Sequence, residues 1–308
     1  MHDLIIIGSG PAGLSAAVYG KRAGLSLLII EKSPMSGGQI LNTYEVDNYL
    51  GLPGINGFDM GVKFREHAEG MGVEFLEAEV SAVEDGEVKV VHTDAGDYQA
   101  KTLVFAMGAE HAKLGVPGEE EFSGRGVSYC ATCDGAFYKG KKAAVVGGGD
   151  VALEDAVYLA RTCEKVYVLL RRDEFRGARI LQEELLVLPN VEVLYSTVVE
   201  EICGEDMVSS LLIRRLKEDV QEKLEVSGVF IAVGIIPNTE LCREIVDCDA
   251  QGYVLAGEDG ITSAPGIFAA GDAREKGLRQ VVTAVADGAN AAVSAANYLN
   301  RVNKIEKN

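Results

Sequence analysis

Apolar and polar residues fall in blocks at the start of the chain. The apolar run Leu4–Ile7 ends at a glycine-rich turn, Gly8–Gly13, and Leu14–Ala23 has the pattern of a helix. A second apolar run, Leu25–Ile30, ends at the acidic residue Glu31. Short apolar runs joined by a glycine turn and a helix are typical of buried parallel strands. The pattern predicts a β–α–β unit.

The same arrangement recurs near the middle of the chain. The apolar run Ala143–Val146 leads into Gly147–Ala152, a predicted helix over 152–161 and another apolar run, Lys165–Leu170. A repeated β–α–β unit with a glycine fingerprint indicates two dinucleotide-binding sites. We therefore expect an α/β protein with two Rossmann-like, three-layer dinucleotide-binding domains.

The rest of the pattern is made of shorter elements. We expect strands between residues 73 and 106 to include an antiparallel group. The predicted elements are a helix over 58–71 and strands over 73–83, 87–92, 98–101, 102–106, 191–197, 209–216, 222–226 and 228–233.

The end of the chain supplies a further strand, Gly266–Asp272, followed by a long helix from Arg279 to about Leu299. Such a strand needs a parallel sheet beside it, and only the first domain lacks its last strand. We expect the first domain to be split, with residues 1–113 and 247–308 forming it and residues 114–246 inserted as the second domain. The linkers would lie near 114–118 and 248–252.

The first fingerprint, G-x-G-x-x-G, suits a dinucleotide. Gly8 allows the tight turn, Gly10 lets the backbone approach a pyrophosphate, and Gly13 lets helix and strand pack closely. Glu31 is placed to accept hydrogen bonds from a ribose. The glycine pair after it, Gly37-Gly38, is absent from a plain NAD domain, so it indicates FAD, although a flexible loop would look the same.

Asp272 would bind the ribityl or phosphate region of the flavin, while a simple helix N-cap is the alternative. The start of the last helix would face the pyrimidine edge of the flavin. The residues that we assign to FAD are Gly8, Gly10, Pro11, Ala12, Gly13, Glu31, Gly38, Gln39, Asn48, Gly108, Gly271, Asp272, Arg279 and Gln280.

The second fingerprint, G-x-G-x-x-A, differs where the ribose binds. The position of Glu31 is taken by Leu170, and Arg171, Arg172 and Arg176 follow it. Guanidinium groups bind a 2′-phosphate, which an acid would repel, so the site should prefer NADPH to NADH. The residues that we assign to NADPH are Gly147, Gly149, Asp150, Val151, Ala152, Arg171, Arg172, Arg176 and Gly234.

Charge and cysteine content limit the classes of partner and the cellular compartment that we expect for the protein. The net charge of −18 argues against nucleic acid and anionic membranes as partners. No apolar run is long enough to span a membrane, and there is no signal-peptide pattern. Of the six cysteines, only Cys130 and Cys133 have a functional spacing, which favours the reducing cytoplasm over a secreted disulfide scaffold.

Three interpretations of Cys130-Ala131-Thr132-Cys133-Asp134 compete. A zinc site needs four ligands, and no second pair has matching spacing, so no metal site is expected. A buried, inert pair is possible in principle, but a redox-active dithiol is favoured. Asp134 could then relay the proton released when a thiolate forms.

With these motifs in this order, the whole chain resembles the bacterial low-molecular-weight thioredoxin reductases, of the class II pyridine nucleotide-disulfide oxidoreductases. The matching segments are Cys130–Gly135, Gly147–Ala152, the three arginines after Leu170, Gly271-Asp272, Arg279-Gln280 and Asp287-Gly288. Two positions depart from the family, which commonly has His at Leu170 and a small hydroxyl residue at Val151.

The resemblance implies a homodimer that uses FAD and NADPH to reduce thioredoxin disulfide. It implies that Cys133 lies next to flavin C4a and attacks thioredoxin, that Cys130 resolves, and that Asp134 is the acid/base. The pair must meet both flavin and a protein disulfide, so we expect domain rotation about the two linkers. Alternatives are ferredoxin as donor, a glutaredoxin-like or peroxiredoxin-linked acceptor, a dithiol oxidase, or a redox sensor without turnover.

Overall fold

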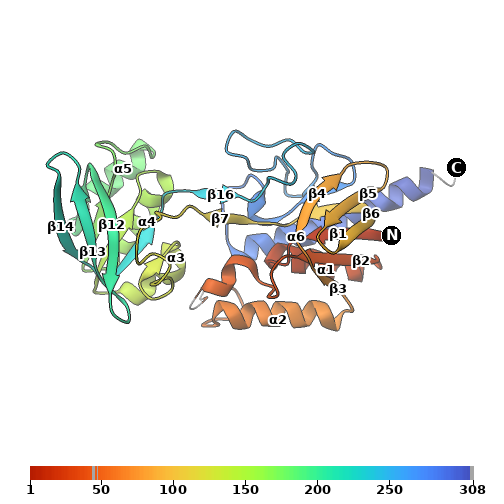
Figure 1. Ribbon diagram of the computed structural model, residues 1–308, viewed down its shortest axis with the longest axis horizontal. Coiled ribbons are helices and arrows are strands. Elements are labelled where there is room, and N and C mark those ends of the chain that lie inside the picture. Colours follow the sequence, from red (N-terminus) through yellow and green to blue (C-terminus); the bar gives the residue numbers. More distant parts are fainter. Residues whose placement is uncertain (44–45, 47, 306–308) are drawn as a thin grey trace. The chain divides into compact units, whose positions relative to one another are not determined.

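The structure, a computed structural model, describes residues 1–43, 46 and 48–305. The described chain forms two compact units. Unit 1 contains Met1–Thr43, Tyr49–Glu110 and the chain from Ile236 onward, and unit 2 contains His111–Ile235. The second unit is therefore inserted in the first (Figure 1).

Unit 1 is built on a seven-stranded sheet of order β3-β2-β1-β6-β5-β4, with β17 paired to β6. Strands β1, β2, β3, β6 and β17 pair in parallel, whereas β4 and β5 are antiparallel. Its elements are β1 His2–Ile7, α1 Pro11–Arg22, β2 Leu27–Glu31, η1 Gly38–Asn42, α2 Gly57–Gly70, β3 Glu74–Glu77, β4 Val80–Glu84, β5 Lys89–Thr93, β6 Gly96–Phe105, β17 Ile267–Ala269, η3 Gly271–Ala273 and α6 Val281–Ile305.

The two faces of this sheet bury different partners, because successive residues of β1 point to opposite sides. Leu4 and Ile6 pack with α1 and α6. Ile5 and Ile7 pack against the opposite layer, which includes Cys242 and Val254. The result is the expected three-layer arrangement.

Close packing of α1 against α6 depends on Gly288. A Cβ atom at that position would lie 2.0 Å from the carbonyl oxygen of Ala12. No side chain can replace this hydrogen without moving a helix, so the C-terminal helix is fixed directly over the start of α1.

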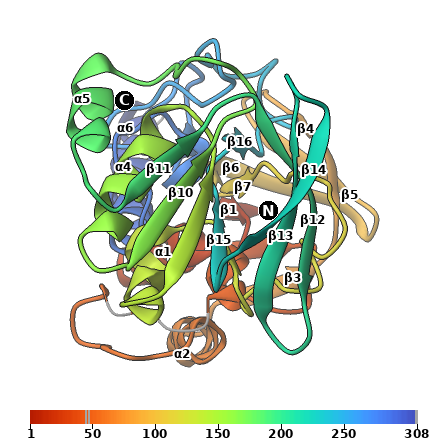
Figure 2. The same cartoon turned by 90° about the vertical axis from the view of Figure 1, so that its left-hand side faces the viewer.

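Unit 2 has a five-stranded parallel sheet of order β11-β10-β9-β15-β8 and a three-stranded antiparallel sheet of order β12-β13-β14 (Figure 2). Its elements are β8 Val127–Ser128, α3 Ala131–Asp134, η2 Gly135–Tyr138, β9 Lys142–Val146, α4 Asp150–Ala160, β10 Lys165–Leu169, α5 Arg179–Leu186, β11 Val191–Leu194, β12 Thr197–Gly204, β13 Val208–Arg215, β14 Val220–Glu225 and β15 Gly228–Ile231.

This unit is also layered. Ala143 and Val145 of β9 pack on the side of α4. Ala144 and Val146 pack on the side of the antiparallel sheet. Alternation along one strand thus separates a helical layer from a β layer, and the fold class predicted from the sequence is confirmed.

The chain passes between the units through two short strands. These are β7 Ala109–His111 and β16 Ile235–Pro237, which pair with each other. The return lies well before the expected boundary at residues 246–247, because Cys242 and Val246 are buried in the core of unit 1. The segment 248–252, expected as a linker, therefore belongs to unit 1.

Two strand predictions need correction. Residues 73–83, expected as one antiparallel strand, form β3, which pairs in parallel with β2, and then β4, which pairs antiparallel with β5. The segments 98–101 and 102–106 are one strand, β6, whose second half turns to the parallel partners β1 and β17. Helices α3 and α5 were not predicted.

Candidate functional site

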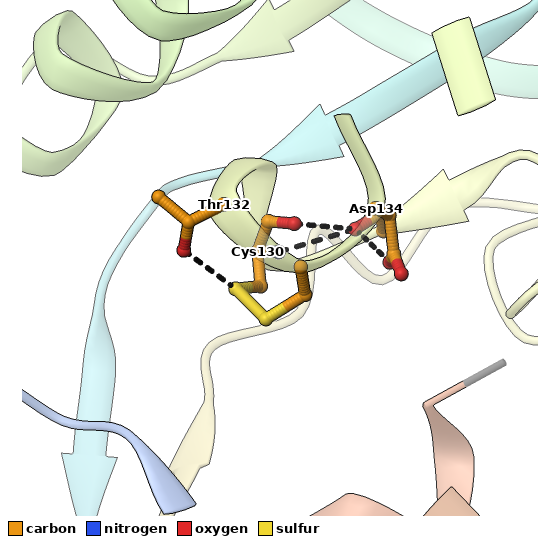
Figure 3. Close-up of a disulfide and its surroundings, with 5 residues drawn as sticks. Cys130, Thr132 and Asp134 are labelled. Carbon is orange, nitrogen blue, oxygen red and sulfur yellow. Dashed lines mark hydrogen bonds between the residues drawn. A yellow bond between two sulfur atoms is a disulfide. The ribbon is translucent and has the colours of Figure 1, made fainter. Parts of the chain in front are cut away.

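Cys130 and Cys133 form a disulfide with a Cα–Cα distance of 5.3 Å (Figure 3). The pair lies at the start of α3, a single helical turn. The N–H groups of Cys133 and Asp134 donate to the carbonyl oxygen of Cys130 at 3.3 and 3.1 Å. Ala131, between the cysteines, is fully buried in the core that includes α4. The dithiol is therefore held at the end of β8 by the packing of one small side chain.

Asp134 lies beside the disulfide and is largely shielded from water. Its Oδ2 accepts a hydrogen bond from the hydroxyl of Ser128 at 2.6 Å. Its Oδ1 is buried and has no hydrogen-bond partner. Burial raises the pKa of Asp134, and the hydrogen bond from Ser128 opposes that rise. A carboxyl group in this state can exchange a proton closer to neutral pH than an exposed one.

A second acid near the cysteines escaped the sequence analysis. Asp155 of α4 lies near the backbone N–H of Ala131, which favours the ionised form of its carboxyl group. Burial raises the pKa of Asp155 to about 7, and the charge of Glu154 adds to the rise. Nothing in the sequence separates Asp155 from the other acids of α4, because only the packing of α3 on α4 reveals its partner.

Replacing Asp155 by asparagine should stabilise the protein above neutral pH. The folded state binds a proton on Asp155 that the unfolded chain releases at lower pH, so the native fold loses stability as pH rises from about 4 to about 7. An asparagine side chain at this position would keep the shape of the aspartate without carrying charge. Asp155→Asn should raise the free energy of unfolding by about 1–3 kcal/mol at pH 8 and leave it nearly unchanged at pH 4.

Urea unfolding at both pH values measures this effect. Glu164→Gln, at an exposed acid just beyond α4, is the matched control and should shift neither value. If Asp155→Asn raised the free energy of unfolding equally at pH 4 and pH 8, proton uptake by Asp155 would not be the cause of the increase.

In unit 1, the first glycine fingerprint forms the turn between β1 and α1. Gly8 has a φ of +103°, and a Cβ atom at Gly13 would lie 1.9 Å from the carbonyl oxygen of Gly8. Gly10 is open, because a Cβ there would meet no atom closer than 4.0 Å. Gly10 also gives α1 no side-chain cap, whereas Asn56 caps α2. Pro11, the first residue of α1, has no N–H, so the uncapped N–H groups available for a phosphate begin with that of Ala12.

Glu31 ends β2 beside this turn. Its Oε2 accepts hydrogen bonds from the backbone and hydroxyl of Ser9 at 2.8 and 2.9 Å, and its Oε1 accepts from the N–H of Ser33. Each carboxylate oxygen can accept more than one bond. Glu31 is therefore oriented by the protein and keeps capacity for a ribose hydroxyl.

Gly271 and Asp272 form a short turn, η3, after β17. Asp272 Oδ1 is buried without a hydrogen-bond partner and lies 3.3 Å from Lys276 Nζ. Burial raises the pKa of Asp272, and the charge of Lys276 opposes it. Oδ1 is paired with a cation but makes no hydrogen bond, so it can accept from the ribityl hydroxyl expected here. Asp272 is not a side-chain cap of η3.

The turn is supported by a buried ionic network that sequence reasoning described only in part. Asp287 of α6 accepts from the N–H of Gly271 at 3.1 Å. It also pairs with Arg274 at 2.7 Å and Lys276 at 2.9 Å. Asp287 was matched only as part of a family segment, and the two cations were not singled out, because a single sequence gives no sign that these charges are buried.

The other residues assigned to FAD are in several parts of the fold. Gly38 and Gln39 begin η1, and Gly108 is in the left-handed region with open space around its Cα. Asn48 is exposed. Arg279 stacks its guanidinium 4.1 Å from the ring centroid of Tyr253, and Gln280 precedes α6.

In unit 2, the second fingerprint joins β9 to α4. A Cβ at Gly147 would lie 2.3 Å from the carbonyl oxygen of Ala232, whereas one at Gly149 would meet nothing within 4 Å. Asp150 accepts a hydrogen bond from the N–H of Ala178 at 2.6 Å, so it ties this turn to the start of α5. Val151 is half exposed and Ala152 is buried. Gly234, with a φ of +139°, lies beyond β15.

The arginines expected to recognise a 2′-phosphate follow β10. Arg171, Arg172 and Arg176 are exposed, and in the described part of the chain none of them forms a salt bridge. Arg179, by contrast, pairs with Glu183 at 2.9 Å. The N–H of Arg176 donates to the carbonyl oxygen of Gly148, which ties the basic loop to the glycine turn. Leu170 is buried, with its Cδ2 packed over Gly148.

Two Rossmann-like units, one of which carries a disulfide beside a buried acid, define a nucleotide-dependent disulfide oxidoreductase. The sequence profile of the pyridine nucleotide-disulphide oxidoreductases matches residues 2–288. The chain belongs to this family and, within it, to the low-molecular-weight thioredoxin reductases. That group uses FAD and NADPH.

Three thioredoxin reductases match this chain over nearly their full length. Thioredoxin reductase of Listeria innocua is 44% identical over 97% of this chain and 94% of its own. Thioredoxin reductase of Bacillus subtilis is 43% identical over 100% of this chain and 98% of its own. The crystal structure of thioredoxin reductase from Streptococcus pyogenes has a TM-score of 0.92 and 44% identity, covering 98% of this chain and 99% of that one. In the described residues, no helix is long and apolar enough to cross a membrane.

Proposed function

We propose that this protein reduces thioredoxin disulfide with electrons from NADPH, through FAD and the Cys130–Cys133 pair. The observation that carries the proposal is the Cys130–Cys133 disulfide next to Asp134, whose Oδ1 is buried, in a domain with its own nucleotide turn. The relatives are thioredoxin reductases by name, which supports thioredoxin as the acceptor.

The residues of unit 1 fit FAD. The open turn at Gly10 and the uncapped start of α1 would hold its pyrophosphate, and Glu31 its ribose. Asp272, whose buried Oδ1 has no hydrogen-bond partner, would accept from the ribityl chain. When bound, FAD supplies two-electron chemistry between a nicotinamide and a disulfide.

The residues of unit 2 fit NADPH. Gly149 leaves room for the pyrophosphate at the uncapped start of α4. Arg171, Arg172 and Arg176 would bind the 2′-phosphate, which NADH lacks. Leu170 and Val151, the departures from the family pattern, leave the basic loop intact.

Side chains of the protein itself perform the thiol–disulfide exchange with the acceptor. In the reduced enzyme, the Cys133 sulfur attacks the acceptor disulfide and its proton passes to Asp134. One acceptor sulfur leaves as a thiolate and takes that proton. Cys130 then attacks Cys133, and the proton of the Cys130 thiol passes to the second acceptor sulfur as it leaves. This step re-forms the Cys130–Cys133 disulfide and releases the acceptor as a dithiol.

Two further features belong to the proposal. The paired strands β7 and β16 are where we place the hinge for domain rotation, because the chain leaves unit 1 and returns to it through them. We also infer a cytoplasmic homodimer, and the exposed apolar residues Phe58, Val282 and Val293 of unit 1 are compatible with a contact between copies.

Donor and acceptor screening tests the function. Purified protein is given NADPH, NADH or reduced ferredoxin, and thiol release is followed from thioredoxin, a glutaredoxin-like protein and a peroxiredoxin-linked protein. We expect NADPH with thioredoxin to give steady turnover. Turnover with ferredoxin alone would identify a different donor, oxygen consumption with a free dithiol would indicate an oxidase, and a single turnover without recycling would indicate a sensor.

A further inference from the structure

Ser128 holds a central position beside the disulfide, although no sequence motif singled it out. It ends β8, pairs with Phe230 of β15 and is buried. Its hydroxyl donates to Asp134 Oδ2 at 2.6 Å and accepts from the N–H of Cys130 at 3.1 Å. One hydroxyl therefore joins the backbone of the first cysteine to the acid that follows the second.

The direction of these bonds follows from the hydroxyl's single hydrogen. The carbonyl oxygen of Cys130 is a second possible acceptor, but it lies farther away, at 3.3 Å. The N–H of Cys130 can only donate, so it occupies a lone pair of the Ser128 oxygen. The hydrogen is left for the closer carboxylate oxygen, and a bond to an ionised acceptor is the stronger of the two.

The bond from Ser128 leaves Asp134 with one fixed and one unused oxygen. Oδ1 is buried and has no hydrogen-bond partner, and in the described residues no cation pairs with Asp134. The ionisable group that interacts with Asp134 is Tyr138 on η2, and Lys141 lies 5.9 Å from the ring centroid of Tyr138. Helix α4, which packs against α3, carries Asp155 and Glu154. Ser128 is thus the side chain that donates to the carboxylate.

We propose that Ser128 is a positioning residue, which orients Asp134 and stabilises its ionised form so that Oδ1 is free to exchange a proton with the dithiol. The inference rests on the acid/base role proposed for Asp134. Ser128 touches neither the reacting sulfur atoms nor a cofactor in this role, and it acts through the carboxylate.

The test uses the reduced full-length protein without nicotinamide or thioredoxin. The protein is reduced with dithiothreitol, and the rate at which iodoacetamide alkylates the dithiol is followed by mass spectrometry from pH 4 to 9. If Asp134 exchanges the proton, the rate profile has an acid limb that reports its ionisation. Ser128→Ala should move the midpoint of that limb upward by about one pH unit, because the ionised carboxylate loses its donor.

Further variants make the result specific. Asp134→Asn should abolish the acid limb, and adding Ser128→Ala to it should change nothing further. Ser128→Thr keeps the hydroxyl and should retain the original midpoint. Ser210→Ala removes another buried hydroxyl of unit 2, one without a hydrogen-bond partner, and should not shift the profile.

The inference is overturned if Ser128→Ala leaves the midpoint of the acid limb unchanged. It is also overturned if Ser128→Ala still shifts the rate profile in the Asp134→Asn background. A profile that Asp134→Asn leaves intact overturns it as well. The assay is independent of the proposed function, since failure of donor and acceptor screening would leave these pH profiles unaffected.

Discussion

Replacing Cys133 by serine should abolish the reduction of protein disulfides. We expect at least about a 10³-fold loss of turnover, because the variant lacks the sulfur that attacks the acceptor. Reduction of the bound flavin by NADPH should persist, since those electrons arrive before the dithiol acts. Stopped-flow absorbance under anaerobic conditions measures the flavin step, and thiol release from thioredoxin measures the second.

The other cysteines provide the controls. Cys130→Ser should also lose turnover but should accumulate a covalent mixed disulfide with thioredoxin, because Cys133 can attack and nothing resolves the product. Cys203→Ser replaces a free cysteine of β12 and should keep normal activity. Turnover of thioredoxin by Cys133→Ser would overturn the role given to the pair, and a trapped complex in that variant would exchange the roles of the two cysteines.

Removing the two adjacent arginines should remove the preference for NADPH. Arg171→Ala with Arg172→Ala should raise the KM for NADPH by about 10²–10⁴-fold, since each charge-assisted contact to a phosphate contributes about 1.5–3 kcal/mol. The KM for NADH should change by less than about threefold, because NADH carries no 2′-phosphate. Steady-state kinetics with both nucleotides measure the two values.

Arg179→Ala is the matched control in the same basic segment. Its guanidinium already pairs with Glu183, so its removal should leave both KM values nearly unchanged. If the KM values for NADPH and NADH rise equally in the double variant, the arginines support the loop as a whole and do not select the 2′-phosphate. The donor preference would then have to come from other residues.

The repeated motif made most of the architecture predictable. Both glycine turns need small residues for packing, and both start an uncapped helix, so spacing alone located β1, α1, β9 and α4. We predicted that unit 1 is split because the strand near the end of the chain needed a parallel sheet to join. In the structure this strand, β17, pairs with β6. The domain boundary was harder to place, because Cys242 and Val246 look like any apolar residues until their partners in the core are known.

The candidate site was predictable only where a motif marked it. Cys130, Cys133 and Asp134 are contiguous, and their spacing shows what they can do. Ser128 and Asp155 come from β8 and α4 and meet the cysteine segment only through tertiary packing. Arg274 and Lys276 likewise gain meaning only from Asp287, a residue of the distant helix α6. Single residues without periodicity or spacing give no such signal in one sequence.

The insertion has a consequence for synthesis of the protein on the ribosome. Residues 111–235 are continuous, so unit 2 can fold as soon as they emerge. Unit 1 cannot complete its fold until β17 and α6 are synthesised. Before then, β6 lacks its partner strand β17, and the apolar face of α1 is not covered by α6. Between the end of β6 and the end of α6 lie roughly 200 residues, which take about 10–40 s to translate at ordinary rates. During that time the first hundred or so residues expose an apolar sheet edge and helix face, which makes the nascent N-terminal segment the natural client of a chaperone.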